Sequence, residues 1–150
     1  MFDTMIRGGT VIDGTGRPGF RADVGITAGK IAALGSLSAA QAGCVIDASG
    51  RAVTPGFIDI HRHADAAAFR PGYGELELRQ GLITIVNGNC GLSAAPFGEA
   101  HAAAVRAYLR PITGDIPADM PSASMADYLA ALHELPLHTG MLAGAGILRA

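Results

Sequence analysis

Charged residues are scarce in this chain. Only 16% of its 150 residues are Asp, Glu, Lys or Arg, while 49% are hydrophobic, and soluble domains average about a quarter charged. Such a chain either buries much of itself or presents apolar surface for another segment to cover. The net charge is −2 and the basic residues form no run, so we expect no nucleic-acid or anionic-membrane partner.

Long apolar runs and cysteine pairs are also missing. Residues 1–10 contain no apolar core of a secretion signal, and no stretch approaches the ~18 unbroken apolar residues that a membrane span needs. The two cysteines, Cys44 and Cys90, lie far apart and outside any CxxC pattern. We therefore expect a cytoplasmic protein with free thiols, no disulfide framework and no membrane association.

The first third of the chain contains a series of short β patterns. The apolar runs of residues 1–54 are separated by turn signals, among them Ala28-Gly29 and Ser49-Gly50. Strands at this spacing predict a small sandwich or a partial barrel. Residues 14–19, GTGRPG, match the GxGxxG pattern only in spelling, because Pro18 and the β-like residues after it argue against the helix that dinucleotide binding requires.

After Thr54 the pattern changes to alternating strands and helices. Strands are predicted at GFIDIHRH, LITIV and the segment beginning HTGM, and helices at GYGELELRQ, GEAHAAAVRAYLR and after a cap at Ser124 with Asp127. Within the middle helix, Val105, Tyr108 and Leu109 are predicted to share one face. The three prolines of residues 111–123 predict a loop.

This alternation is typical of βαβ units and a parallel sheet. The predicted fold class is therefore α/β, with two domains. Residues 1–54 are predicted to form a β-sandwich segment. Residues 55–150 are predicted to form the first strands of a TIM-like (β/α) barrel, which is incomplete in this chain because a full barrel takes about 250 residues.

Two histidines end the strand predicted at PGFIDIHRH. His61 and His63 are two residues apart, so on a strand their side chains would share a face with Phe57 and Asp59. Two strand steps span roughly 6.6 Å, and imidazoles that far apart can converge on one ion at about 2.1 Å from each nitrogen. Active sites of α/β barrels lie at this end of the strands. The alternative is two solvated or hydrogen-bonded histidines.

Cys90 follows the predicted strand LITIV, so its thiol can lie at the same end of a neighbouring strand. A thiolate binds zinc well, and the alternative is a small buried apolar residue. Asp65 has the chemistry for a substrate contact or for an outer-sphere partner of a ligand, or it caps the next segment. Asp59 is a second candidate for that role and is otherwise a structural carboxylate. The remaining histidines are interpreted as bystanders: His101, His133 and His138.

Three segments carry a resemblance to a known family. VTPGFIDIHRHAD resembles the first barrel strand of the amidohydrolase superfamily, with its HxH metal motif, and residues 5–35 resemble the N-terminal β segment of that superfamily. QGLITIVNGNCGLSAAP is similar to a loop of the N-acyl-D-amino-acid deacylases (D-aminoacylases), in which a cysteine stands where hydantoinases and dihydroorotases use a carboxylated lysine. The chain departs from the family pattern at Ala64, where an aspartate is frequent, and at Ala145, where a histidine is common.

The resemblance implies zinc-dependent hydrolysis of the amide bond of N-acyl-D-amino acids. It implies that Cys90 serves a tightly bound zinc, and that His61 and His63 bind a second, more weakly held divalent metal. Two more histidines and the aspartate that acts as general base would come from later strands, so no catalytic residue is expected in this chain. Alone the chain is expected to be inactive. It is an excerpt of a longer enzyme, a subunit that a second chain completes, or a remnant.

Two alternatives stay open at this point. A cyclic amidohydrolase of the hydantoinase or dihydroorotase type would use a lysine on its fourth strand in place of Cys90. A non-catalytic assembly module would keep the fold and bind no zinc, and Ala145 and the short length favour it.

Overall fold

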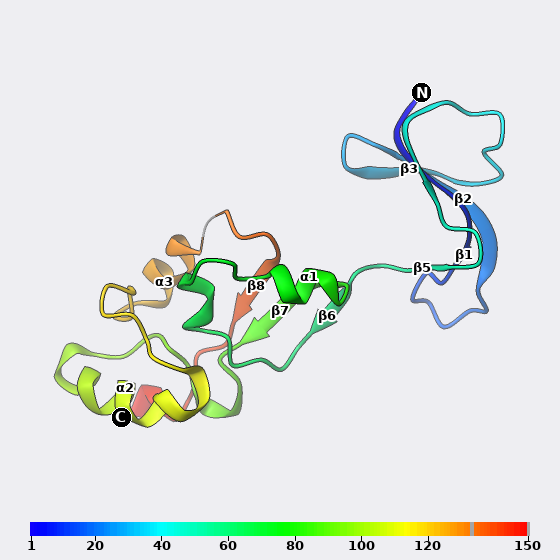
Figure 1. Cartoon of the computed structure of the whole chain (residues 1–150). Helices are drawn as coiled ribbons and strands as arrows, with labels where there is room; N and C mark the ends of the chain where they lie inside the picture. Colours follow the sequence, from blue (N-terminus) through cyan, green and yellow to red (C-terminus); the bar gives the residue numbers. More distant parts are fainter. Residues whose placement is uncertain (133, 150) are drawn as a thin grey trace. The chain divides into compact units, whose positions relative to one another are not determined.

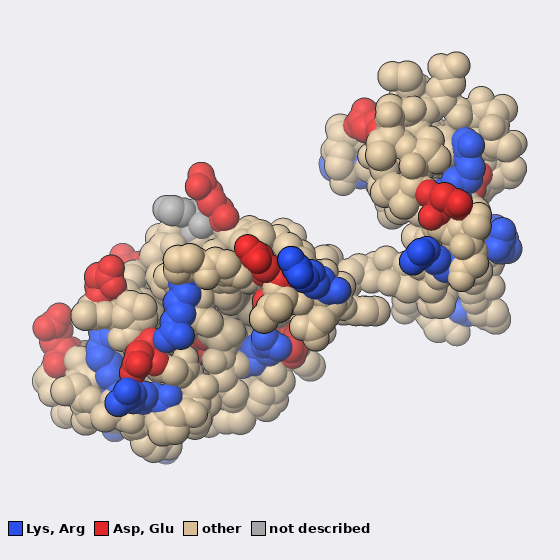
Figure 2. All heavy atoms as spheres, in the orientation of Figure 1, with Lys and Arg blue, Asp and Glu red and all other residues tan. Residues whose placement is uncertain are grey.

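The structure is a computed structural model that describes residues 1–132 and 134–149 (Figure 1). The chain forms two compact units, Met1–Pro55 and Gly56–Ala150, called here the N-terminal and C-terminal units. Uncharged atoms cover most of the visible surface of each unit, in keeping with the low charge content (Figure 2). Within the described ranges, no helix has the length and apolar character to cross a membrane.

Five strands make up the N-terminal unit: β1 (Phe2–Val11), β2 (Phe20–Thr27), β3 (Lys30–Gly35), β4 (Ala42–Asp47) and β5 (Ala52–Val53). They form one mixed sheet of order β3-β2-β1-β4, and β5 also pairs with β1. β1 runs antiparallel to β2 and parallel to β4 and β5. The described strands of this unit thus lie in one layer, and the facing sheet that a sandwich requires stays a prediction.

The predicted hairpin at Ala28-Gly29 joins β2 to β3. Both turn residues have positive φ, 51° and 72°, as the tight turns of two-residue hairpins require. Residues 14–19 form an irregular connection without a helix, so the GxGxxG match is spurious, as predicted. The small apolar core of the unit comes from β1 and β2 and is centred on Val11, Ala22 and Val24.

The C-terminal unit is built on a parallel sheet of β6 (Phe57–Asp59), β7 (Leu82–Asn87) and β8 (His138–Met141), in that order. The predicted parallel sheet is therefore confirmed. The connection from β6 to β7 contains η1 (Ala67–Phe69) and α1 (Glu75–Arg79), and α1 lies against β7 (Figure 1). The other helical segments are η2 (Asn89–Gly91), η3 (Glu99–His101), α2 (Ala102–Thr113) and α3 (Met125–Ala131), before β8, and η4 (Ile147–Arg149), after it.

Helices α2 and α3 supply much of the core of the C-terminal unit. Val105, Leu109 and Tyr128 are buried in one cluster, and the predicted cap of α3 is confirmed because Ser124 Oγ accepts a hydrogen bond from Asp127 N at 3.1 Å. Tyr108, which was predicted on the same face as Val105 and Leu109, is 64% exposed. The buried stripe of α2 is narrow, so Tyr108 falls on its flank.

Helix α2 also runs further than predicted, through Pro111 to Thr113. A proline here lacks the N–H that would bond to the carbonyl four residues earlier, and its ring crowds that carbonyl. Because Pro111 stands in the last turn, both effects fall close to the point where the helix ends. The end of the helix keeps other bonds, because Thr113 Oγ1 donates to the carbonyl of Leu109 and Gly114 N donates to that of Arg110. The helix stops at Gly114, whose φ is 75°, so the loop begins three residues later than expected.

Candidate metal centre

His61 and His63 lie in the loop that follows β6 and not on the strand itself. β6 ends at Asp59, so the prediction that strand alternation places the two imidazoles on one face is wrong. The loop is held in two other ways. The Asp59 carboxylate accepts a hydrogen bond from His61 N at 3.0 Å, and Arg62 N donates to the carbonyl of Val86 at 3.0 Å, which keeps the loop beside the end of β7.

Cys90 lies in a tight turn directly after β7. Its φ is 58°, and the flanking Gly88 and Gly91 have φ of 76° and 74°. Gly88 is required by packing as well, because a Cβ at this position would lie 2.0 Å from the carbonyl oxygen of Leu142. The segment after β8 thus packs closely against this turn. The side chain of Cys90 is exposed to solvent.

The three predicted ligands come together. One donor atom each from His61, His63 and Cys90 lies within 4.8 Å of the other two, and His61 Nε2 is 3.2 Å from Cys90 Sγ. Zinc bonds of about 2.0–2.3 Å at tetrahedral angles put nitrogen and sulfur ligands roughly 3.5 Å apart. The spacing in the structure is therefore compatible with a shared ion after small side-chain adjustments.

Burial adds a second observation on this cluster. His63 is half-buried, and its Nδ1 atom is inaccessible and has no hydrogen-bond partner among the described residues. An unpaired polar atom of this kind is unusual in folded proteins and calls for a missing partner. Imidazole nitrogen and thiolate sulfur together are a donor set that suits zinc, so the residues present fit a zinc ion.

The two predicted carboxylates differ in their surroundings. Asp65 is fully buried, its Oδ1 accepts a hydrogen bond from Ala94 N at 3.2 Å, and its Oδ2 has no partner in the part of the chain that the structure describes. Burial raises the pKa of this carboxyl, against the lowering effect of the bond from Ala94 N. Asp59 is more accessible and lies 3.6 Å from the guanidinium of Arg62, in addition to its bond with His61 N.

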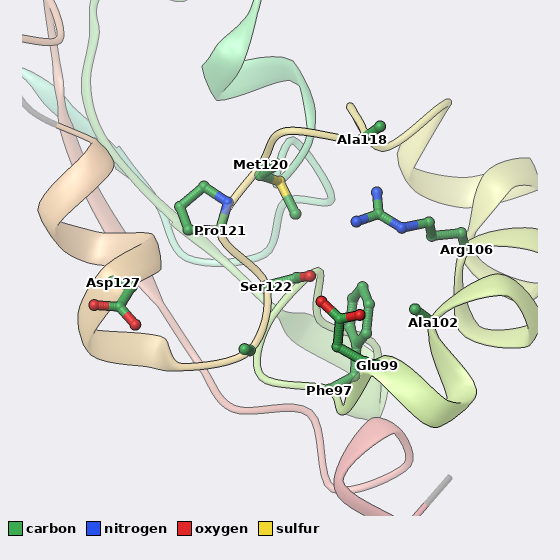
Figure 3. Close-up of a pocket in the computed structure, with 10 residues that line it drawn as sticks. Phe97, Glu99, Ala102, Arg106, Ala118, Met120, Pro121, Ser122 and Asp127 are labelled. Atoms are coloured by element: carbon green, nitrogen blue, oxygen red, sulfur yellow. The ribbon is translucent and has the colours of Figure 1, made fainter.

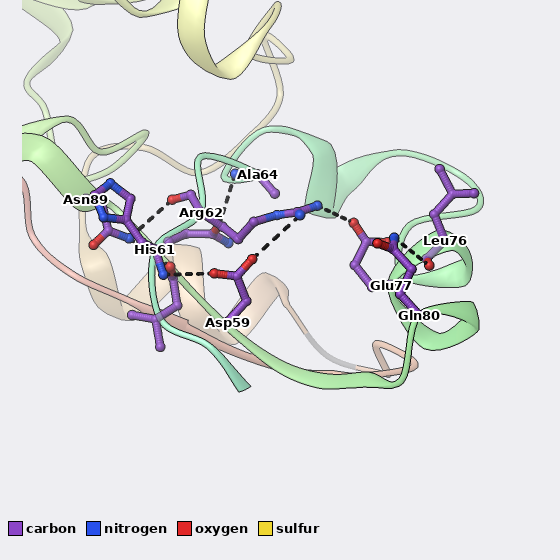
Figure 4. Close-up of polar contacts among 10 residues, drawn as sticks. Asp59, His61, Arg62, Ala64, Leu76, Glu77, Gln80 and Asn89 are labelled. Carbon is purple, nitrogen blue, oxygen red and sulfur yellow. Dashed lines mark hydrogen bonds and ion pairs between the residues drawn. The ribbon is translucent and has the colours of Figure 1, made fainter. Parts of the chain in front are cut away.

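Several residues of this site were not predicted from the sequence. Arg62 forms an ion pair of 2.6 Å with Glu77 of α1, and Asn89 donates to the backbone carbonyls of Val86 and Arg62. Figure 4 shows the ion pair and the bond from Asn89 to Arg62. The only sequence signal for Arg62 and Asn89 is that each of them directly adjoins a predicted ligand, and Glu77 has no such signal. The bystander interpretation fits His101 and His138, which are exposed and outside the cluster, whereas His133 lies outside the described residues.

A separate cavity of about 360 Å³ lies between α2, α3 and the segment that joins them (Figure 3). Phe97, Glu99 and Arg106 line it, and none of the three clustered residues does. The guanidinium of Arg106 has a structural role, since its Nη1 donates hydrogen bonds to the backbone carbonyls of Ile116 and Pro117. The cavity therefore stays apart from the candidate metal centre.

Comparison with known proteins places this geometry in a family. A profile described as "Amidohydrolase family" matches residues 44–141, and the chain therefore belongs to the amidohydrolase family. An N-acyl-D-glutamate deacylase of Alcaligenes xylosoxydans xylosoxydans is 48% identical over 132 residues, which cover 87% of this chain and 25% of the relative.

Two solved structures are similar over 99% of the chain. A D-aminoacylase described with a binuclear metal centre has a TM-score of 0.85 and 40% identity, with 31% of its own length covered. The N-acyl-D-glutamate deacylase of Bordetella bronchiseptica, complexed with zinc and a phosphonate inhibitor, has a TM-score of 0.78, 38% identity and 30% coverage. The chain thus spans between 25% and 31% of the length of the three relatives described here.

Proposed function

We propose that this chain is the N-terminal part of a zinc-dependent enzyme that hydrolyses the amide bond of N-acyl-D-amino acids. The observation that carries the proposal is the cluster of His61, His63 and Cys90 at the ends of neighbouring parallel strands. A cysteine at this place favours a deacylase over a cyclic amidohydrolase, which by the family resemblance would use a lysine. The similarity to D-aminoacylase and N-acyl-D-glutamate deacylase points to the same substrate class.

In this proposal the chain supplies metal ligands and their supports. Cys90 would serve both a tightly bound zinc and a second, weaker divalent metal, and His61 and His63 would hold the second metal together with Cys90. When bound, the metal would polarise the amide carbonyl and activate water. Asp59 would orient the histidine loop through His61 N. Asp65 would act behind the ligands, because its complete burial leaves no surface for substrate.

We further propose that β6, β7 and β8 are the first strands of a larger barrel, and that the N-terminal sheet is one layer of a sandwich. Both β6 and β8 are edge strands, and Phe57, Ile58 and Ile60 at the β6 edge are 56%, 62% and 72% exposed. Apolar edges of this kind are normally paired or covered. Further strands, from the same polypeptide or from a second chain, would cover them and bring the general base and the remaining ligands.

The test uses the full-length polypeptide that carries this chain. We expect it to release free amino acid from N-acetyl-D-methionine or N-acetyl-D-glutamate and not from the L-enantiomers. Chelation should abolish turnover and zinc should restore it. Cys90→Ala should reduce turnover at least ~100-fold, because it removes a metal ligand. Cys44→Ala is the matched control, since Cys44 is an exposed thiol of the N-terminal unit, and it should have no effect.

Each alternative outcome has a clear meaning. Turnover that resists both chelation and Cys90→Ala would refute the proposal. Hydrolysis of hydantoins in place of N-acyl-D-amino acids would identify a cyclic amidohydrolase. A protein that binds no zinc and turns over neither substrate class would be a non-catalytic module.

A further inference from the structure

Asn89, the residue before Cys90, joins the two loops that carry the clustered side chains. Its Nδ2 donates to the carbonyl of Val86 at 2.8 Å and to the carbonyl of Arg62 at 3.3 Å. Arg62 stands between His61 and His63 in the sequence, so this one carboxamide contacts the backbone of the histidine loop from the cysteine turn (Figure 4). The second bond spans 27 residues of sequence and is a contact between loops, beyond any local turn.

Neighbouring bonds reinforce the same junction. The carbonyl of Val86 also accepts the hydrogen bond from Arg62 N at 3.0 Å. Asn87 is fully buried, and its Oδ1 accepts a hydrogen bond from Ala64 N, the residue after His63, at 3.0 Å. The segment 62–64 is thus held against residues 86–89 by hydrogen bonds that include both asparagine side chains.

These bonds matter because strand pairing does not reach the ligands. The pairing of β6 with β7 ends at Asp59 and Ile85, before His61, His63 and Cys90 are reached. Beyond that point, the separation of the cysteine turn from the histidine loop depends on loop–loop contacts. Side chains that support ligands from behind normally change metal affinity 10–100-fold when they are mutated.

We propose that Asn89 is a positioning residue of the metal centre. Its carboxamide fixes the distance of Cys90 from His61 and His63, with Asn87 as a second support. This proposal rests on the proposed function, because it assumes that the three side chains share a metal site.

The experiment replaces Asn89 in the full-length protein and measures metal binding directly. Asn89→Asp keeps the size of the side chain and removes both donor hydrogens. Cobalt(II) serves as the probe, because a thiolate bound to cobalt gives a near-ultraviolet absorption band that reports the Cys90–metal bond independently of turnover. We expect the variant to bind cobalt 10–100-fold more weakly and to lose most of this band.

Gln80→Glu is the matched control. Gln80 Nε2 donates to the carbonyl of Leu76 at 3.1 Å on α1, so the substitution removes the same type of amide-to-carbonyl bond from the same unit. This variant should show the wild-type affinity and band. If a merely structural role explained the effect of Asn89→Asp, the two variants would behave alike.

Two outcomes would count against the proposal, and a second variant covers the case in which the first does not fold. An Asn89→Asp protein with cobalt affinity within about twofold of wild type and an unchanged band would overturn it. If circular dichroism shows that this variant does not fold, Asn89→Ser, which cannot reach both carbonyls, takes its place with the same expected loss. A wild-type protein without a thiolate–cobalt band would instead refute the proposed metal centre itself, so the two failures are distinguishable.

Discussion

The two units of the chain differ in how fully their polar side chains are hydrogen-bonded. In the N-terminal unit, Asp23 accepts hydrogen bonds from Gly8 N at 2.8 Å and Leu37 N at 2.9 Å. The bond from Leu37 N, followed by that from Gly8 N, holds the pKa of this carboxyl below its ordinary value. Asp47 is similarly bonded to Ser49, which lowers its pKa. These carboxylates stabilise the folded chain by accepting hydrogen bonds from backbone N–H groups of the same unit.

In the C-terminal unit, several buried polar atoms have no partner. Over residues 1–132 and 134–149, four buried side-chain atoms lack a hydrogen bond, and three of them belong to this unit: His63 Nδ1, Asp65 Oδ2 and Asn87 Nδ2. All three residues lie at or beside the ends of β6 and β7. Because unpaired buried polar groups cost free energy, their concentration here distinguishes this part of the C-terminal unit from the N-terminal unit, where Arg7 Nε is the one such atom among the described residues.

The largest test of this contrast is Gly88→Ala, in the turn that carries Cys90. The added Cβ would lie 2.0 Å from the carbonyl oxygen of Leu142, and φ is +76°. Both the clash and the left-handed backbone oppose alanine, so we expect a loss of more than about 3 kcal/mol in unfolding free energy. Urea unfolding followed by circular dichroism measures it.

Gly14→Ala is the control for Gly88→Ala. Gly14 has a similar φ of +79°, but an alanine Cβ at this position would have open space around it, with no atom of the described residues within 4 Å apart from its chain neighbours. Only the backbone penalty of about 1 kcal/mol should remain. Equal losses for the two variants would show that the close packing of the cysteine turn against the segment after β8 is not what makes Gly88 necessary.

The next test removes a partnered polar group from the C-terminal unit. Tyr128 is fully buried, and its hydroxyl donates to the carbonyl of Asp65 at 3.0 Å. Burial raises the pKa of Tyr128, so the hydroxyl remains a donor at neutral pH. Tyr128→Phe leaves that carbonyl without this donor and should cost about 1–2 kcal/mol, measured by urea unfolding.

Tyr108→Phe provides the comparison, since Tyr108 is 64% exposed, and it should change stability by less than about 0.5 kcal/mol. An equally small effect of Tyr128→Phe would mean that the core around Asp65 tolerates unpaired groups. The difference in hydrogen bonding between the two units would then not correspond to a difference in unfolding free energy.

Local signals in the sequence predicted much of this molecule. The Ala28-Gly29 hairpin and the Ser124 cap depend on neighbouring residues alone, and both are confirmed. The parallel sheet followed from the alternation of element types. The residue types His, His and Cys, at or after the ends of two predicted strands, selected the three side chains that the structure brings together only in combination with the family resemblance.

What the sequence could not predict depends on contacts between distant segments. β6 ends at Asp59, and the backbone of Arg62 and Ala64 beyond it forms hydrogen bonds with the carbonyl of Val86 and with the side chains of Asn87 and Asn89. No local sequence pattern predicts these partners. The pairing of Arg62 with Glu77 depends in the same way on the packing of α1. The clustering of the three side chains was therefore predicted correctly, but with the wrong backbone beneath the two histidines.

A smaller effect is expected at the cap of α3. Ser124→Ala removes the bond from Asp127 N and should lower the unfolding free energy by about 1 kcal/mol. Ser122→Ala, in the preceding loop, should have less effect, because Ser122 lies outside the cap position. A loss at Ser124 sharpens the comparison, since it shows that the C-terminal unit also has a stabilising, partnered polar side chain outside the candidate metal centre.

The smallest expected effect concerns pH and the N-terminal unit. The folded-state pKa of Asp23 is lowered, so the ionised carboxylate favours the folded state. This contribution is fully present above the ordinary aspartate pKa of about 3.9 and is lost as pH falls through the lower, folded-state value. Wild-type protein should therefore lose thermal stability in acid below about pH 4 more steeply than Asp23→Asn, which cannot ionise. The measurement is the thermal midpoint across an acid pH series, with Asp119→Asn, an exposed carboxylate, as control. Parallel curves for wild type and Asp23→Asn would show that the two backbone donors do not depend on the charge of Asp23, and the hydrogen-bonded carboxylates of the N-terminal unit would then no longer support the comparison.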